Sequence, residues 1–194
     1  MNEFLRYLLT AEGMADGWAA VVEQWEWFTH GAPQSAFSHI KEKGIEPRWP
    51  DGSFDIEELI GARGRDGQAI VCLTPIPKTR SVSICKNEDV FVMAIHRDDL
   101  PREIGIDCTF GGTYEQAAQW RAERPNATAA EIFRESVRDR EVVVSFVTIR
   151  PEIIRVCPKA APGALFADWP IITSIELADA SLFGPPDLMG CVRI

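Results

Sequence analysis

The chain has 194 residues, of which 46% are hydrophobic, and it carries a formal net charge of -9 at pH 7. This length and composition predict one folded domain with room for a small addition, and they exclude a disordered chain. The negative charge argues against a protein held on nucleic acid mainly by phosphate neutralisation. No apolar run approaches the length of a membrane-spanning helix, and the N-terminus lacks the features of a secretory signal, so we expect a cytoplasmic protein.

Several well-known site motifs are missing from the sequence. The five cysteines are widely spaced without a CxxC pair, and His30 and His39 do not form an HExxH arrangement, so no metal site or disulfide framework is predicted. There is also no GxGxxG, GxxxxGK[ST] or GxSxG motif. The sequence therefore supports neither a Rossmann site, nor a P-loop, nor an α/β-hydrolase nucleophile.

The first 25 residues show helical patterns over 3–10 and 15–24, where apolar residues recur at helical spacing. We predict an N-terminal helical extension, residues 1–25, packed on a single domain of residues 26–194. The tryptophans of this region lie close together in the sequence. We expect them in the core, and the alternative is that they form a surface that faces a partner.

The most informative stretch is a strand over 26–30 that leads into His30-Gly31. Pro33 suits the first position of a helix over 33–43, and Gly44 suits the position just beyond its end. A bare glycine backbone beside an imidazole is typical of a small-molecule cleft. The alternative is an ordinary strand–turn–helix in which His30 is structural.

The segment 46–68 is loop-like and contains Arg48, which would meet either a phosphate or water. A buried strand over 69–74 ends in Thr74, a weaker strand is expected over 81–85, and a strong strand follows over 90–95. Residues 105–113 are expected to be irregular.

Two capping boxes predict the central helices, with Thr113 and Gln116 before helix 114–123 and Thr128 and Glu131 before helix 128–139. A β-branched strand over 140–147 follows, with Glu141 near its start. A turn over 151–154 then leads into a last strand, and 171–177 is strand-like. The predicted helices and strands do not alternate regularly as they do in an α/β protein, so the sequence predicts the α+β class.

Three elements of the chain, taken in order, resemble the ADP-ribosyltransferase superfamily, in its His-containing branch of diphtheria-toxin-like enzymes and poly(ADP-ribose) polymerases. The first is His30-Gly31 followed by a helix and the corner Gly44-Ile45-Glu46-Pro47. The second is the strand ending in Thr74, with Ser81 and Ser83 as an alternative. The third is Glu141 leading a late strand, followed by Pro151-Glu152-Ile153. The resemblance covers residues 26–157, and it departs from the family where Ala32 replaces the usual Ser/Thr and Thr29 stands directly before His30.

The resemblance implies a split β-sheet core with flanking helices and a site for NAD as substrate. The backbone of Gly31 would grip the nicotinamide carboxamide, His30 would bond the adenosine ribose, and Glu141 would hold the 2′-hydroxyl of the nicotinamide ribose. Thr74 and Arg48 are expected in the same site, and an unidentified aromatic ring, with Tyr114 as one candidate, would stack on nicotinamide. These residues would converge on one hollow of dinucleotide size.

The implied activity is mono-ADP-ribosyl transfer to a protein or nucleic acid, as in a bacterial toxin with a cognate antitoxin. Two alternatives stay open. An RNA 2′-phosphotransferase of the same fold would gather Arg48, Arg80, Arg150 and Arg155 at the cleft. A non-enzymatic acidic binding or immunity protein, or an inactive relative of the fold, would instead use the negative charge and the Trp-rich N-terminus.

Overall fold

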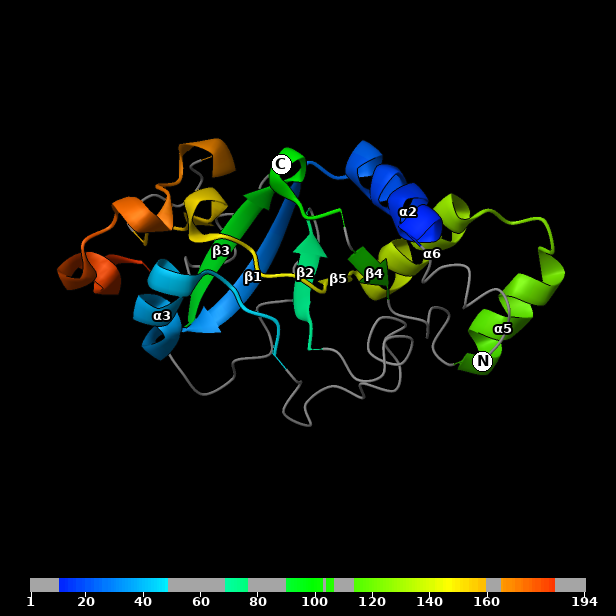
Figure 1. The fold of residues 1–194 in the computed structure, drawn as a ribbon, viewed down its shortest axis with the longest axis horizontal. Helices are drawn as coiled ribbons and strands as arrows, with labels where there is room; N and C mark the ends of the chain where they lie inside the picture. The colour runs from blue at the N-terminus through cyan, green and yellow to red at the C-terminus, as the bar shows by residue number, and fades with distance from the viewer. Residues whose placement is uncertain are drawn as a thin grey trace. The chain divides into compact units, whose positions relative to one another are not determined.

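The computed structural model describes residues 11–48, 69–76, 90–102, 104–106, 114–159 and 165–183. The helices are α2 (Ala11–Gln24), α3 (Phe37–Lys43), α5 (Tyr114–Glu123) and α6 (Ala129–Arg140). The strands are β1 (Trp27–Pro33), β2 (Val71–Pro75), β3 (Val90–His96), β4 (Ile104–Ile106), β5 (Val143–Ser145) and β6 (Arg155–Val156) (Figure 1). Short 3-10 turns connect several of them.

All strand pairs among these residues are antiparallel, in the hydrogen-bonded order β4-β5-β2-β1-β3-β6. Strand β2 belongs to two ladders. Its residues 71–73 pair with β5, whereas Thr74 and Pro75 pair with β1. Helices together with an antiparallel sheet confirm the predicted α+β class.

Backbone contacts divide the chain into two compact units, each assembled from three segments. The first, called the α6 unit, consists of residues 1–25, 47–73 and 101–147. The second, called the β1 unit, consists of residues 26–46, 74–100 and 148–194. Each unit is described by itself below.

In the α6 unit, α2 packs along α6, as Figure 1 shows. The inner face of α6, Ile132, Phe133 and Val137, is buried, and Gly17 of α2 allows the Phe133 ring to approach. The predicted capping box is present, because Thr128 accepts from the Glu131 N–H and the Glu131 carboxylate accepts from the Thr128 N–H. Apolar packing of these two helices stabilises the unit.

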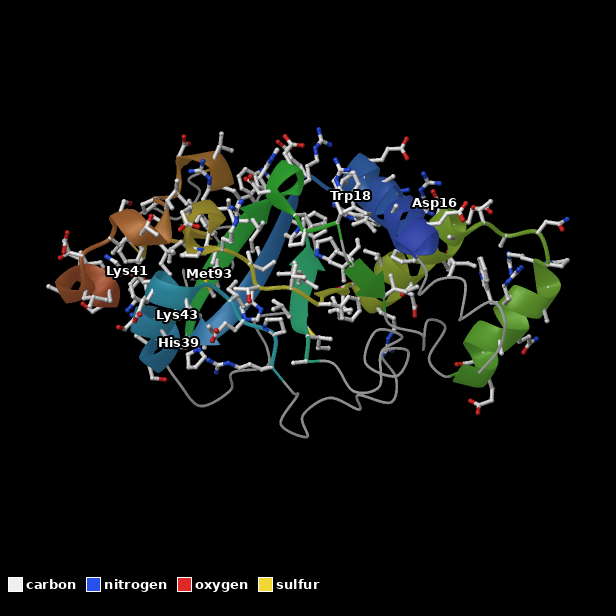
Figure 2. The ribbon with its side chains drawn as sticks, viewed as in Figure 1. Asp16, Trp18, His39, Lys41, Lys43 and Met93 are labelled. Carbon is white, nitrogen blue, oxygen red and sulfur yellow. The ribbon has the colours of Figure 1, made fainter. Side chains whose placement is uncertain are left out.

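In the β1 unit, β1 and β3 pair along their whole length, from Trp27↔His96 to Pro33↔Val90, and lie side by side in Figure 1. Phe37 of α3 packs between the Phe91 and Phe183 rings. Lys41, labelled on α3 in Figure 2, donates to the Ile175 carbonyl. Side-chain contacts therefore attach the C-terminal 3-10 turns to the helix that follows β1.

Four predicted boundaries differ from the structure. Strand 26–30 is β1, which runs on through Gly31 to Pro33, so the predicted helix 33–43 begins as a 3-10 turn (Gln34–Ala36) before α3. Residues 104–106 form β4 inside a region expected to be irregular. Residues 171–177 are not a strand, because Ile171 makes only an isolated bridge with Arg155 and 3-10 turns cover Ile172–Ser174 and Leu177–Leu182.

The fourth difference concerns strand 140–147, which is only Val143–Ser145 because α6 continues to Arg140. The remaining elements expected over 15–24, 69–74, 90–95, 114–123 and 128–139 are confirmed within a few residues. The expected helix 3–10 and strand 81–85, together with Thr113, lie outside the described residues.

Candidate functional site

His30 and Gly31 lie in the middle of β1, not at its end as predicted. They pair with Met93 and Val92 of β3, and both residues are half-buried. Side chains alternate across a strand, so the imidazole of His30 shares its face with Met93, which is labelled in Figure 2. The continuous β1–β3 ladder holds both residues in a fixed register.

Two hydrogen bonds at the start of β1 fix the direction of its backbone polar groups. The Ile76 N–H donates to the Trp27 carbonyl at 3.0 Å, and the Arg97 N–H donates to the Glu26 carbonyl at 2.8 Å. Trp27 therefore directs its carbonyl towards β2 and Glu26 directs its own towards β3. Because this direction alternates along a strand, the polar groups of Gly31 point to the same side as those of Trp27.

On that side, the pairing of β1 with β2 stops at Thr29↔Thr74. No strand among the described residues pairs with Gly31 on this edge. The N–H and C=O of Gly31 thus form an adjacent donor and acceptor at an open strand edge. A primary carboxamide, which the resemblance implies as the group bound here, has the complementary donor and acceptor.

The glycine at position 31 is not required by the backbone conformation. Among the described glycines, only Gly44 has a positive φ. Glycine in a strand interior weakens the strand, and it often marks a place where a ligand or another backbone approaches closely. Close approach at the open edge is therefore a physical reason for glycine at this position.

Thr74 occupies the fork where β2 leaves β1. It is 3% exposed, and the Thr29 hydroxyl donates to its carbonyl at 3.3 Å. Thr74 lies opposite Thr29, so its side chain is on the opposite face of the sheet from that of His30. Its burial and position favour a structural role at the fork over the predicted role in cofactor binding.

Glu141 is half-buried and caps the C-terminus of α6 in the left-handed conformation, with φ 58° and ψ 29°. Its N–H donates to the Val137 carbonyl at 3.0 Å. Val142 then packs against the cluster of Ile70, Val144 and Phe146, and β5 begins at Val143. Glu141 therefore does not open a strand as predicted but forms the corner between a helix and a strand.

Arg48 has an exposed side chain and a fixed backbone. Its N–H and C=O exchange hydrogen bonds with Ile70, at 3.0 Å and 3.1 Å. Because Ile70 belongs to the cluster that Val142 contacts, Arg48 is attached to the same small core as the residue after Glu141. The α6 unit therefore holds Arg48 and Glu141, and the β1 unit holds His30, Gly31 and Thr74.

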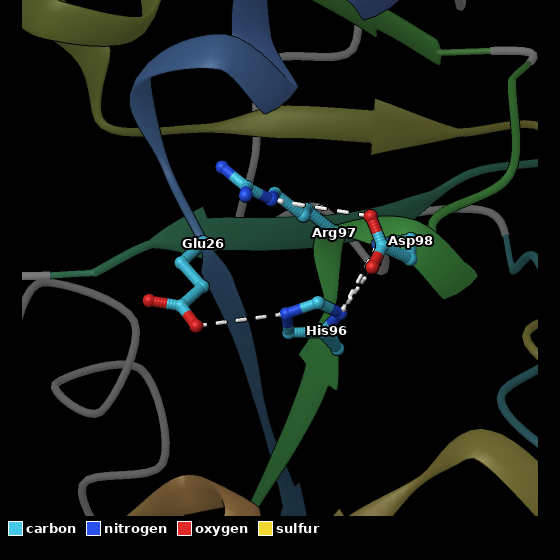
Figure 3. Close-up of polar contacts among 4 residues, drawn as sticks. All are labelled: Glu26, His96, Arg97 and Asp98. Carbon is cyan, nitrogen blue, oxygen red and sulfur yellow. Dashed lines mark hydrogen bonds and ion pairs between the residues drawn. The ribbon is translucent and has the colours of Figure 1, made fainter.

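A polar cluster at the ends of β1 and β3 was not singled out from the sequence (Figure 3). His96 Nε2 lies 3.7 Å from Glu26 Oε1, and His96 Nδ1 lies 3.4 Å from Asp98 Oδ2. The Asp98 N–H also donates to Nδ1 at 3.3 Å. Since both carboxylates are largely exposed, the cluster fixes the turn after β3 rather than forming a reactive centre. A histidine at a strand end followed two residues later by Asp is the signal in the sequence.

A surface groove of about 530 Å³ lies between α5 and α6. Its walls include Trp120, with the Arg124 guanidinium 4.7 Å above the ring, and the side chains of Arg134 and Arg138. Three glutamates balance the three arginines of the lining. None of the residues predicted for the NAD site lines this groove.

The chain was compared with protein-family models, with curated proteins and with solved structures, and none of them matches it. Among the helices described, none combines the length and the apolar character needed to span a bilayer.

Proposed function

We propose that the protein is a mono-ADP-ribosyltransferase, which cleaves NAD and transfers ADP-ribose to a macromolecular acceptor. The observation that carries the proposal is the open edge of β1 at Gly31. Gly31, whose φ does not require glycine, has an N–H and a C=O that no described strand pairs on this side, one residue after His30. This arrangement fits the carboxamide of nicotinamide, which is the part of NAD that an enzyme of this class releases.

The division of the strands also supports the proposal. The resemblance implies a split sheet, and β2 pairs with β5 through residues 71–73 and with β1 only through Thr74 and Pro75. The pairing of β1 with β2 thus ends two residues before Gly31. The end of a ladder leaves the backbone groups beyond it without a partner from that strand.

In the proposed mechanism, Gly31 holds the carboxamide and His30 bonds the adenosine ribose. By the resemblance, Glu141 is the residue proposed to accept a hydrogen bond from the 2′-hydroxyl of the nicotinamide ribose. Cleavage of the glycosidic bond builds positive charge on that sugar, and the carboxylate stabilises this charge more than it stabilises ground-state NAD. Nicotinamide leaves with the bonding electron pair, and a nucleophilic group of the acceptor attacks the sugar. Arg48 would meet the pyrophosphate.

The test is to incubate the full chain with NAD labelled in its adenylate phosphate, with and without cell lysate. Released nicotinamide is measured by chromatography, and label is counted in the protein, DNA and RNA fractions. Loss of one electrostatic group of this kind costs about 10²–10³ in rate, so Glu141→Gln should reduce release by that factor. Glu135→Gln, also on α6, is the matched control and should release nicotinamide at the wild-type rate.

Three results would refute the proposal. One is the absence of nicotinamide release in every lysate. The second is release by Glu141→Gln at the wild-type rate. The third is release that requires RNA carrying a 2′-phosphate, since that would identify an RNA 2′-phosphotransferase.

A further inference from the structure

Three tryptophans in the described part of the chain are half-buried, and two of them are covered by arginines of the same chain. The Arg102 guanidinium lies 5.1 Å from the centroid of the Trp18 ring, and the Arg124 guanidinium lies 4.7 Å from that of Trp120. Such a cation is attracted by the negative face of the indole ring. Trp27 is the third, and none of the arginines and lysines that the structure describes lies over its ring.

The Trp27 ring belongs to an aromatic group at the start of β1. Its centroid lies 5.6 Å from that of Phe166 and 4.8 Å from that of His96, which stands edge-on to it at 67°. Trp27 and Phe166 also pack against the buried cluster that contains Cys157 and Trp169. Core packing therefore fixes both rings, while each remains only half-buried and keeps part of its surface open to a partner.

Two carboxylates lie at the same end of β1. Glu26 and Asp98 approach the imidazole of His96 from two sides, at 3.7 Å and 3.4 Å (Figure 3). Both distances are longer than an ordinary charge-assisted hydrogen bond, and the two side chains are 65% and 79% exposed. Arg97 Nε lies 3.9 Å from Asp98 Oδ1, which is a weak pair at an exposed position. The carboxylates are therefore accessible to a cation from outside the chain.

The segments that carry these rings and carboxylates are acidic. Residues 26–27, 96–99 and 165–169 contain four carboxylates and one arginine. Arg155 adds a second positive charge, since its Nη1 donates to the carbonyls of Ala167 and Trp169. Four carboxylates against two arginines leave a net charge of -2 with histidine neutral. This charge attracts a basic partner and repels the phosphates of a nucleic acid.

We propose that the aromatic and acidic side chains at this end of β1 form a docking site for an arginine side chain of a partner protein. The site, called the Trp27 site, consists of Glu26, Trp27, Asp98 and Phe166. The guanidinium lies on the Trp27 ring as that of Arg124 lies on Trp120, and its N–H groups donate to the two carboxylates. Arginine is favoured over lysine, because its planar and weakly hydrated guanidinium stacks on an aromatic ring and donates in a fork. The Trp27 site requires no NAD, so it is independent of the proposed function.

Two amidated peptides of equal length and charge test the aromatic part of the site, one of alternating glycine and arginine and one of alternating glycine and lysine. Calorimetry with the full chain should show that the arginine peptide binds at least about threefold more tightly. Trp27→Leu should remove this preference. Trp27→Phe keeps an aromatic ring, covers the case in which Trp27→Leu does not fold, and should reduce the preference. Equal binding of the two peptides by the wild type, or an unchanged preference in Trp27→Phe, would overturn the proposal.

The carboxylates are tested by a double variant, Glu26→Gln with Asp98→Asn, in which both altered side chains are exposed. It should bind both peptides about tenfold more weakly than the wild type at low salt, and its binding should depend less on salt. The matched control is Glu176→Gln with Asp179→Asn, which removes two other exposed charges of the β1 unit and should bind within about twofold of the wild type. Equal losses in the two double variants would mean that net charge alone attracts the peptides, and this result would also overturn the proposal.

Discussion

The Thr29 hydroxyl donates to the Thr74 carbonyl at 3.3 Å, at the last residue pair that β1 and β2 share. Both residues are 3% exposed. This bond therefore lies at the fork of the two ladders, beyond which the polar groups of Gly31 point to an open edge. A buried hydroxyl at a fork is expected to fix the residue at which the strands part.

Replacing Thr29 by valine keeps the shape of the side chain and removes this hydrogen bond. We expect the free energy of unfolding to fall by about 1 kcal/mol, the net value of a typical intramolecular hydrogen bond. Chemical denaturation measures the change, and Thr29→Ser, which keeps the hydroxyl, should lose clearly less. Equal losses in the two variants would show that the methyl group and not the hydroxyl is important at the fork.

The corner at Gly44 gives a second prediction. Its φ is 82°, and a Cβ at this position would lie 2.1 Å from the Ile149 carbonyl oxygen. That carbonyl also accepts from the Ile45 N–H at 2.9 Å, so it has little freedom to move. Gly44→Ala should therefore lower the free energy of unfolding by at least about 2 kcal/mol.

The matched control for Gly44→Ala is Lys43→Ala at the preceding exposed residue, which should change stability by less than about 0.5 kcal/mol. Urea denaturation of both variants compares them directly. Wild-type stability in Gly44→Ala would mean that the contact between residues 44–45 and 149 does not persist in solution.

The sequence predicts correctly the helices and strands that are marked by a pattern of neighbouring residues. Helix α6 is found from its capping box and apolar stripe, and β3 is found from its apolar run. The predicted end of β1 at residue 30 is wrong, because Gly31 and Pro33 are taken as residues that end a strand. In the structure the ladder with β3 carries both, and the missing N–H of Pro33 would point to the open edge, where a strand accepts proline.

Other differences arise from tertiary packing. Strand β4 is short and contains Gly105, where a Cβ would lie 2.9 Å from the Phe146 ring, so the strand forms because it packs closely on a distant aromatic residue. The sequence places Glu141 near the start of a β-branched strand over 140–147, since no local pattern shows that α6 extends to Arg140. The candidate residues could be found from the sequence, but the open edge at Gly31 and the left-handed Glu141 could not.

The capping box of α6 predicts a dependence on pH. The pKa of Glu131 is lowered from its ordinary value of 4.5, chiefly because its carboxylate accepts from the Thr128 N–H. A carboxyl whose pKa is lower in the folded state adds stability above its unfolded pKa and loses this contribution as the pH falls through the folded value. Wild-type protein should therefore have a higher Tm than Glu131→Gln near pH 7, and the difference should shrink below about pH 4.5.

A double-mutant cycle isolates this effect. Glutamine can still accept the hydrogen bond, so Glu131→Gln changes mainly the charge. In a Thr128→Ala background, Glu131→Gln should alter the pH dependence of the Tm much less than it does in the wild type. A pH profile that is the same in all four proteins would contradict the role assigned to the pair.

The residue types of Gly31 and Glu141 are both unusual for the sign of their φ angles, in opposite ways. Gly31 is a glycine at a position where φ is not positive, and Glu141 has a side chain at a position where φ is positive. The fold should therefore tolerate a side chain at position 31 and a glycine at position 141. Gly31→Ala in particular should leave the free energy of unfolding unchanged or raise it by about 0.5 kcal/mol, because alanine is more favourable than glycine in a strand.

The same variant should weaken ligand binding. A methyl group on residue 31 stands beside the N–H and C=O that are proposed to bind the carboxamide, so nicotinamide should bind at least about tenfold more weakly. Calorimetry with nicotinamide measures the change, and benzoic acid, which has no amide N–H, should bind weakly to both proteins. Ala32→Ser is the matched control, since residue 32 directs its polar backbone groups towards β3. Undiminished nicotinamide binding by Gly31→Ala would place the carboxamide elsewhere and remove the main support for an NAD site on β1.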